Sequence, residues 1–482
     1  MHAPEPQRSS PPTVEWIGLE QVPSEARHGT PARVGALWFA AQLVPTAFFL
    51  GALGSADFIG LSFGPALLAI VVGTAVGALA PAALSVAGPR TGLPQLAQAR
   101  AIFGRGTALV GVLAFGTSIA FIALGSIFGA EALGITLGLP FLPAVVLVFL
   151  AVALVSTLGY RFMHRVERVM AVVVGAGFLV LTVAVAARAG DMTLSQTSHG
   201  SAALGSFGLM AAISCGFTFA WAHNAADYCR YLPRDVSARR LFTWVWLGIV
   251  SACVWLEGLG LAASTLLPDT APMASVHALV GGGPLGATVL VALCLGVIAN
   301  ATVAQYSAGL QLLAAGVRLP RPVVTVLTGL VALALTLYLR HGDLAARFTN
   351  VMLLASYWVG PFVGIVAVWW WQRPSTAGLA TAAASAIRAL PARPHAVAAL
   401  LAGFLACLPF SNTTLGTDLA ARHAVLDALL GSVSRGVLHG ADLAYPVGLL
   451  AGGGVYLWLE GVGALRALRA ARVPAVSAAQ TP

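Results

Sequence analysis

Long apolar runs recur along almost the whole chain, from residue 35 to residue 460. A run of about 18 or more apolar residues with few charges is the signature of a membrane-spanning α-helix. Twelve such runs can be read, at 35–54, 63–86, 107–131, 140–158, 169–188, 204–226, 241–266, 285–312, 322–339, 349–371, 395–410 and 441–460. The pattern predicts an all-α polytopic membrane protein with twelve transmembrane helices.

The composition supports this fold class. Hydrophobic residues make up 58% of the chain and charged residues 9%, and the mean hydropathy is +0.87. About a quarter of the residues of an ordinary soluble domain are charged, so a soluble domain is excluded. The net charge of +9 would suggest a nucleic-acid partner for a soluble protein, but here the placement of the positive charges reports membrane topology, and no nucleic acid is expected.

The basic residues are divided unevenly between the loops. All 26 are arginines, and with the amino terminus in the cytosol only Arg188, Arg340, Arg347, Arg422 and Arg435 fall on the outer side. Loops on the cytosolic side of membrane proteins carry the excess of Lys and Arg. Both termini are therefore predicted to be cytosolic, in agreement with an even number of helices.

Three segments follow from this topology. Residues 1–33 are polar, Pro-rich and partly acidic, unlike a cleavable signal, which needs a basic start and an apolar centre. We expect this segment to be a cytosolic tail, followed by a membrane domain of twelve helices at 34–460 and a cytosolic carboxyl-terminal tail at 461–482. The expected location is the cell (plasma) membrane, with the lipid bilayer as a partner; the oligomeric state is open.

Two of the predicted helices contain features that can interrupt a helix. In the first, Pro45 removes a backbone donor, and its neighbours Gln42 and Thr46 can line a cavity. In the sixth, residues 214–224 mix polar and aromatic side chains at membrane depth. Interrupted helices at corresponding positions of two halves of a transporter point to a binding site near the membrane midplane. A proline can also produce a simple kink, because Pro is common in spanning helices.

Two loop motifs resemble those of a known transporter family. The first is the polar, basic segment 88–105, which contains Pro-Arg-Thr-Gly, then Leu-Pro-Gln, and ends in Phe-Gly-Arg. The second is the segment 221–235, with Asp-Tyr-Cys-Arg-Tyr-Leu-Pro at 227–233. Both resemble the nucleobase-cation-symport-1 family, the second most of all its purine and cytosine permease branch. Weaker matches at 129–134, 299–310 and 410–413 extend the resemblance from about residue 33 to about residue 460.

The resemblance implies both a fold and a function. The fold would be of the leucine-transporter type, with ten helices in a five-plus-five inverted repeat and two added carboxyl-terminal helices. The function would be secondary active symport, in which a cytosine-like or purine-like base, or a related N-heterocycle, enters with a cation by alternating access. Allantoin, a hydantoin or a thiamine-type compound is the alternative cargo. The chain would not be an enzyme.

A flat heterocycle needs aromatic stacking surfaces and a few amide-type donors and acceptors. We expect these to come from the first, third, sixth and eighth helices, and the candidates are Gln42, Phe121, Gly125, Phe217, Phe219, Trp221, Asn300 and Gln305. Relatives place a Trp at the position of Phe121, an amide or carboxylate at Gly125, and an Asn where Ala304 stands. These departures imply a larger or less polar pocket, or a base that is recognised by other groups such as His223 or Gln305. Ordinary packing is the alternative role for any one of the aromatic residues.

The coupling ion can be sodium or a proton, and no other cofactor or metal is expected. The resemblance implies a sodium site made of backbone carbonyls at the first-helix break and side-chain oxygens of the eighth helix, with Thr302 and Asn300 as the candidate donors. Ionisable residues at membrane depth are by default functional, which makes Glu257 and His223 the candidates for a proton. A paired structural Glu257 and a hydrogen-bonded packing His223 are the alternatives.

Three other functional classes make different demands on the sequence or on transport. A membrane-embedded enzyme such as a prenyl transferase would need an acidic metal-binding cluster, and the sequence contains no Asp-x-x-x-Asp pair beside a helix. A Walker-type ATP-binding loop requires a lysine, and the chain has none. A passive channel would equilibrate its solute without accumulating it, so only transport measurements separate it from a symporter.

Overall fold

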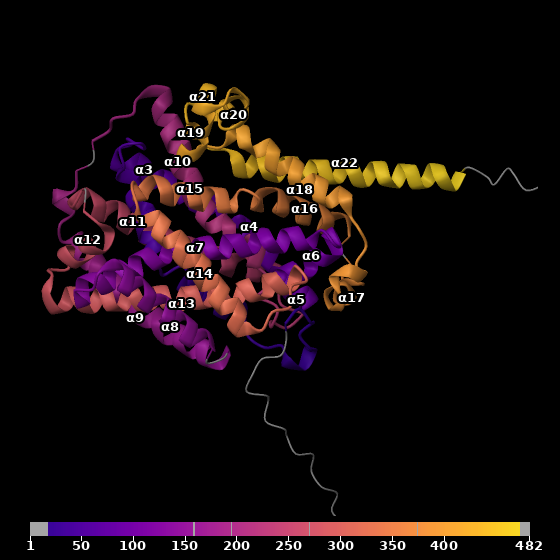
Figure 1. The fold of residues 1–482 in the computed structure, drawn as a ribbon, viewed down its shortest axis with the longest axis horizontal. Helices are drawn as coiled ribbons and strands as arrows, with labels where there is room; N and C mark the ends of the chain where they lie inside the picture. The colour runs from indigo at the N-terminus through magenta and orange to yellow at the C-terminus, as the bar shows by residue number, and fades with distance from the viewer. Residues whose placement is uncertain (1–17, 158–159, 194, 269, 374, 473–482) are drawn as a thin grey trace, which may run out of the picture.

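The computed structural model describes residues 18–472 apart from 158–159, 194, 269 and 374. In this part of the chain the secondary structure is helical, and the only β-type pairing is an isolated bridge between Gly104 and Ala392. The long helices pack beside one another in one body, in which α7 contacts α13 and from which the carboxyl-terminal α22 projects on one side (Figure 1). The prediction of an all-α membrane protein is confirmed.

The predicted spans correspond to helices of the structure, some of them in two or three pieces. They are α1 (Pro31–Ala41) with α2 (Pro45–Ala52), α3 (Phe63–Gly77) with α4 (Leu79–Ser85) and α5 (Ala87–Thr91), α7 (Thr107–Leu137), α8 (Phe141–Thr157), α9 (Tyr160–Ala186), α10 (Gly200–Phe219) with the 3₁₀ turn η4 (Ala220–Asn224), α11 (Ala238–Leu266), α13 (Gly283–Ala314), α14 (Arg321–Arg340), α15 (Leu344–Ser356) with α16 (Val359–Gln372), α18 (Pro394–Cys407) and α22 (Ala444–Arg472). Shorter helices connect them: α6 (Gln95–Phe103), α12 (Pro272–Leu279), α17 (Leu379–Ala384), α19 (Thr414–Arg422), α20 (Ala424–Leu429) and α21 (Ser432–Gly436).

Among the described residues, eight helices are long and apolar enough to cross a membrane, and the bent pair of α1 and α2 makes a ninth span. The helices α8 and α18 are shorter apolar helices. The total of twelve spans and the inverted repeat are consistent with this arrangement and stay predictions.

The interruption predicted in the first span is present. The axis bends by 62° between α1 and α2, Gln42 ends α1, and Val44 is extended ahead of Pro45, the first residue of α2. Proline suits the first position of a helix because its missing N–H would have no partner there. The sequence feature that ends one helix therefore also begins the next.

The interruption predicted in the sixth span is wrong. The helix α10 runs unbroken through residues 214–219, and only at Ala220 does the chain tighten into the 3₁₀ turn η4. The stretch contains no proline to remove a donor. Its one glycine, Gly216, serves close packing, since a Cβ there would overlap the Tyr445 hydroxyl of α22. Polar side chains alone do not break a helix when neighbouring helices surround them.

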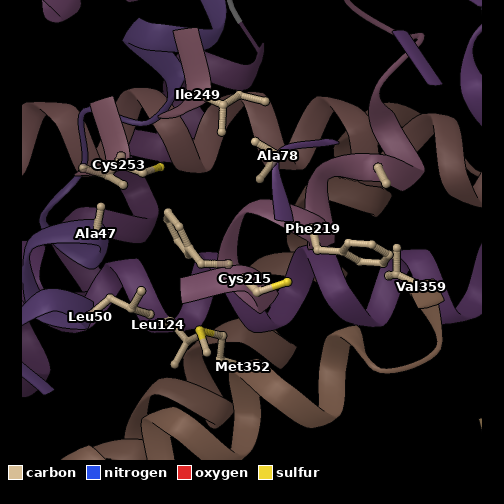
Figure 2. Packing of buried hydrophobic residues seen from close by; sticks show 14 of the residues in the cluster. Ala47, Leu50, Ala78, Leu124, Cys215, Phe219, Ile249, Cys253, Met352 and Val359 are labelled. Carbon is tan, nitrogen blue, oxygen red and sulfur yellow. The ribbon is translucent and has the colours of Figure 1, made fainter. Parts of the chain in front are cut away.

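Glycines bring α2 and α11 into close contact. A Cβ added at Gly51 would overlap the carbonyl oxygen of Glu257, and one added at Gly260 would overlap that of Phe48. Small residues at membrane helix interfaces allow such close backbone approach. Figure 2 shows part of the apolar interior, where Leu50 of α2, Leu124 of α7 and Cys215 of α10 belong to one cluster.

The two family-like loop motifs contact each other on the predicted cytosolic side. The Asp227 Oδ1 atom accepts a hydrogen bond of 2.7 Å from the backbone N–H of Gln95, the first residue of α6. A carboxylate suits this position, because the first N–H groups of a helix have no partner within the helix. The amino-terminal segment joins them: Val22 N–H donates to the Gly92 carbonyl at 2.9 Å, and Arg230 donates to the Gly18 carbonyl at 2.8 Å.

Burial raises the pKa of the Asp227 carboxyl to about 7, although the Gln95 N–H and the positive charge of Arg230 both act to lower it. Because the folded-state pKa lies above the ordinary value of 3.8, folding favours the protonated acid. The protonated Asp227 carboxyl therefore makes its full contribution to the free energy of unfolding below about pH 4, and this contribution is lost as the pH rises through about 7.

We expect Gly51→Ala to lower the free energy of unfolding by about 1–3 kcal/mol or more, because the added methyl group meets backbone atoms that cannot turn aside. The melting temperature of the detergent-solubilised protein would measure this. Gly329→Ala in α14 is the matched control, since a Cβ there has open space around it. Equal melting temperatures for the two variants would contradict the close contact of α2 with α11.

We expect Asp227→Asn to flatten the pH dependence of the melting temperature between about pH 4 and pH 7, because Asn still accepts from the Gln95 N–H but does not ionise. Wild-type protein should lose stability over this range as the pH rises. Asp235→Asn, an exposed carboxyl of the same loop, controls for the loss of one negative charge. If the melting temperature of Asp227→Asn fell with pH as steeply as that of the wild type, Asp227 would not be the group whose raised pKa causes the loss of stability.

Candidate functional site

A small cavity lies beside the break between α1 and α2. It is lined from α2 and the residue before it, from α7 and from α13, by Val44, Thr46, Phe121, Ile122, Gly125, Val297, Asn300 and Ala301. Its volume is about 10 Å³, which is room for about one water molecule. A heterocycle can therefore occupy this place only when the surrounding helices move apart.

Asn300 connects the cavity to the helix break. Its side-chain Nδ2 donates a hydrogen bond of 3.1 Å to the carbonyl of Ala41, the last residue of α1. This carbonyl is one of those that the end of a helix leaves without a partner. The Asn300 Oδ1 atom is not used in this bond and is an acceptor that a ligand can reach. The predicted Asn300 side chain thus both gives the Ala41 carbonyl a hydrogen-bond partner and lines the cavity.

The aromatic candidates divide into three locations. The rings of Phe121 and Phe217 lie with their centroids 5.9 Å apart, so they bring α7 and α10 together at the cavity. Phe219 instead contacts Tyr445 at the start of α22, at 5.4 Å. Trp221 packs edge-on against Trp38 of α1 at 5.8 Å. Among these, only Phe121 lines the cavity itself.

Gln42 has a fully buried side chain whose amide oxygen and nitrogen both have no hydrogen-bond partner. The indole N–H group of Trp221 is also buried without a partner, whereas the Trp38 side chain interacts with the Cys229 thiol. Buried polar atoms in native proteins are nearly always paired, so the Gln42 amide has the capacity to bind a polar ligand or water.

The two glutamines of α13 have different surroundings. Gln305 donates from its side-chain Nε2 to the carbonyl of Thr325 on α14 at 3.0 Å, and it does not line the cavity. Gln311, which sequence reasoning missed, accepts from the Ser118 hydroxyl of α7 at 3.0 Å and donates to the Asn224 side chain at 3.1 Å. Gln311 therefore links α7, α13 and η4 on the predicted cytosolic side of the cavity.

The residues considered for cation coupling also lie apart from one another. The Thr302 hydroxyl donates to the carbonyl of Ile298 in its own helix at 2.8 Å, which leaves its oxygen lone pairs as acceptors. His223 is buried, with Nδ1 at 2.5 Å from the Ala220 carbonyl and Nε2 without a partner. Glu257 is fully buried on α11, where the Thr74 hydroxyl of α3 lies 3.4 Å from its Oε2 atom.

The apolar side of the cavity carried no sequence signal. Val297 precedes Asn300 by three residues and shares its face of the helix, so the helical period places it once Asn300 is chosen. Ala301 is the next residue after Asn300, and only the structure shows that it lines the cavity. Gly125 leaves space: a Cβ there would lie 3.5 Å from the Thr46 Oγ1 atom and 4.0 Å from Val297 Cγ1. With only Thr46 and Asn300 as polar lining residues, the arrangement can hold a ring by packing and a few hydrogen bonds.

Comparison with known proteins agrees with this arrangement. Residues 21–448 match the family described as permeases for cytosine/purines, uracil, thiamine and allantoin. The purine-cytosine permease fcyB of Emericella nidulans is 28% identical over 375 residues, which are 73% of this chain and 72% of that protein. The purine-cytosine permease FCY2 of Saccharomyces cerevisiae is 28% identical over 261 residues, 52% of this chain and 48% of that protein.

The fold is also similar to that of a solved transporter. Mhp1, a nucleobase-cation-symport-1 family transporter in a closed conformation with bromovinylhydantoin bound, superposes with a TM-score of 0.70 at 16% identity, covering 93% of this chain and 96% of Mhp1. At this identity the likeness concerns the fold alone. The match over residues 21–448 covers most of the chain, and the chain therefore belongs to the family of permeases for cytosine/purines, uracil, thiamine and allantoin, as its two loop motifs predict.

Proposed function

We propose that the chain is a secondary active symporter that imports a nucleobase or a related N-heterocycle together with a cation, by alternating access. The observation that carries this proposal is the cavity at the α1–α2 break, where the Phe121 ring, the Thr46 hydroxyl and the Asn300 amide face one space. A discontinuous helix beside a closed central cavity is the arrangement expected of a transporter whose substrate binds near the midplane. Membership of a permease family supports the same function.

The substrate site would extend from this cavity toward Phe217 and toward the unpartnered amide of Gln42. The Phe121 and Phe217 rings would hold a flat ring between α7 and α10, because aromatic rings pair well in offset or tilted arrangements. Asn300 would contribute its Oδ1 atom as an acceptor, and Gln42 both a donor and an acceptor. Gln305 and Phe219, which contact α14 and α22, would act on the site only through packing.

The coupling cation would be sodium or a proton, and a different observation supports each. For sodium, Thr302 lies on the same helix as Asn300, and the Asn300 side chain reaches the break. The hydroxyl oxygen of Thr302 keeps free lone pairs that a cation can use. For a proton, Glu257 is fully buried, and its carboxyl group contacts the Thr74 hydroxyl and the Ser214 side chain. The chain would lie in the cell membrane with both termini in the cytosol, as the distribution of arginines predicts.

Uptake into proteoliposomes tests the proposal directly. The protein would be offered labelled cytosine, hypoxanthine, adenine, uracil, allantoin and thiamine, with a sodium gradient or a proton gradient imposed separately. We expect one compound to accumulate above its external concentration under one of the two gradients. Equilibration without accumulation would identify a passive channel, and the absence of gradient-dependent uptake for every compound would overturn the proposed substrate class.

Gly125 provides a test of the site itself. Gly125→Ala fits the available space but narrows the cavity, so we expect uptake of a bicyclic base to fall roughly tenfold relative to a monocyclic one, which is the usual effect of one carbon in a tight pocket. The initial rates of competing labelled bases would measure this ratio. Gly116→Ala on the same helix, where a Cβ meets nothing within 4 Å, should leave the ratio unchanged. An unchanged ratio in Gly125→Ala would place the substrate elsewhere.

A further inference from the structure

A second cavity lies at the predicted outer ends of the helices. Its volume is about 260 Å³, far more than a water molecule needs. It is lined by the end of α7, the start of α8, the start of α12 and the end of α14, with Ala130, Glu131, Gly134, Ile135, Leu139, Phe141, Ala271, Ala274 and Arg340. Glu131 follows Gly125 by six residues, which at about 100° per residue turns it to a different side of α7 from the central cavity.

Two side chains of opposite charge line this cavity, and the rest of its wall is small or apolar. The Met273 backbone N–H at the start of α12 donates to the Glu131 carboxyl group, and Arg340 lies near enough to attract it, but the buried Oε2 atom has no hydrogen-bond partner of its own. The Arg340 guanidinium lies 4.0 Å from the centroid of the Phe141 ring, which holds it at the wall. A buried carboxylate oxygen without a partner is costly. An occupant that donates a charged hydrogen bond to Glu131 and offers an anion to Arg340 would remove that cost.

Exposed apolar residues place this cavity at the edge of the lipid. Leu137 at the end of α7 is 62% exposed and Leu142 at the start of α8 is 54% exposed. Leu137 stands between the lining residues Ile135 and Leu139, and Leu142 follows the lining residue Phe141. Exposed leucines at helix ends are expected where the protein contacts acyl chains. Tyr338 on α14 is 52% exposed, and tyrosine is enriched where the membrane meets water. A ligand can therefore place its polar group in the cavity and its apolar part along these leucines.

We propose that this outer cavity binds the head group of a zwitterionic phospholipid that carries a primary ammonium. The ammonium donates to the Glu131 carboxylate, the phosphate contacts Arg340, and the acyl chains lie against Leu137 and Leu142. A methylated, quaternary ammonium has no N–H to donate, so a phosphatidylcholine fits less well than a phosphatidylethanolamine. The site is independent of the solute that the protein transports.

The test is lipid-dependent stability of the purified full-length protein. Delipidated protein in detergent would be supplied with phosphatidylethanolamine or with phosphatidylcholine of the same acyl chains, and its melting temperature recorded. We expect phosphatidylethanolamine to raise the melting temperature by several degrees more than phosphatidylcholine. Glu131→Gln and Arg340→Gln should each abolish that difference. Arg347→Gln is the matched control, because Arg347 also stacks on an aromatic ring, that of Tyr338 at 4.5 Å, but does not line the cavity.

Equal stabilisation by the two lipids would overturn the proposal, as would a difference that survives in both cavity variants. Soluble phosphoethanolamine forms a further arm, and a Glu131-dependent effect of the same size would identify a free head-group ligand in place of a lipid. Stabilisation by cytosine or adenine that depends on Glu131 would assign the cavity to the transported solute and also overturn it. Lipid binding is measured here by the melting temperature and not by transport. The result therefore does not depend on the outcome of the uptake experiment.

Discussion

The architecture depends on satisfying the backbone groups that the α1–α2 break exposes inside the protein. Each N–H or carbonyl buried there without a hydrogen-bond partner costs several kcal/mol. Pro45 has no N–H to leave unpaired, and the Ala41 carbonyl accepts from the Asn300 side chain at 3.1 Å. Because Asn300 also lines the central cavity, the geometry of the break and the shape of the cavity are set by the same side chain. A ligand that competes for Asn300 would act directly on the break.

Two kinds of helix contact surround that cavity. Between α2 and α11, glycines bring the two backbones together so closely that no methyl group fits at Gly51 or Gly260. Such an interface has little freedom, and the pair is suited to move as one unit. Across the predicted cytosolic side, by contrast, α13 meets η4 through the side-chain hydrogen bond from Gln311 to Asn224. A bond of this kind can be exchanged for one to water at small net cost, so we expect opening to begin there.

The sequence was enough to predict the spans, the first break and part of the site. The long apolar runs define helices whatever their tertiary neighbours, and Pro45 breaks a helix for local reasons. The all-α fold and the first break are therefore confirmed, while the total of twelve spans stays a prediction. The break expected at 214–224 was wrong because tertiary packing keeps polar side chains within a helix. The roles of Gln305 and Gln311 could not be separated in advance. Both are glutamines of α13, whose sequence does not distinguish one face of the helix from the other. Only the positions of α7 and α14 decide that Gln311 contacts α7 and Gln305 contacts α14.

The contact between Asp227 and the first N–H of α6 joins two loops that are far apart in the sequence. In the first loop, Gly88 has no room for a side chain, since a Cβ there would come within 2.9 Å of the Cys229 Cβ atom in the second. The two segments are therefore complementary surfaces. A hybrid permease that took only one of these loops from a distant relative would lose the complementary contacts between them. The two loops should accordingly be exchanged together, as a single module, when family members are recombined.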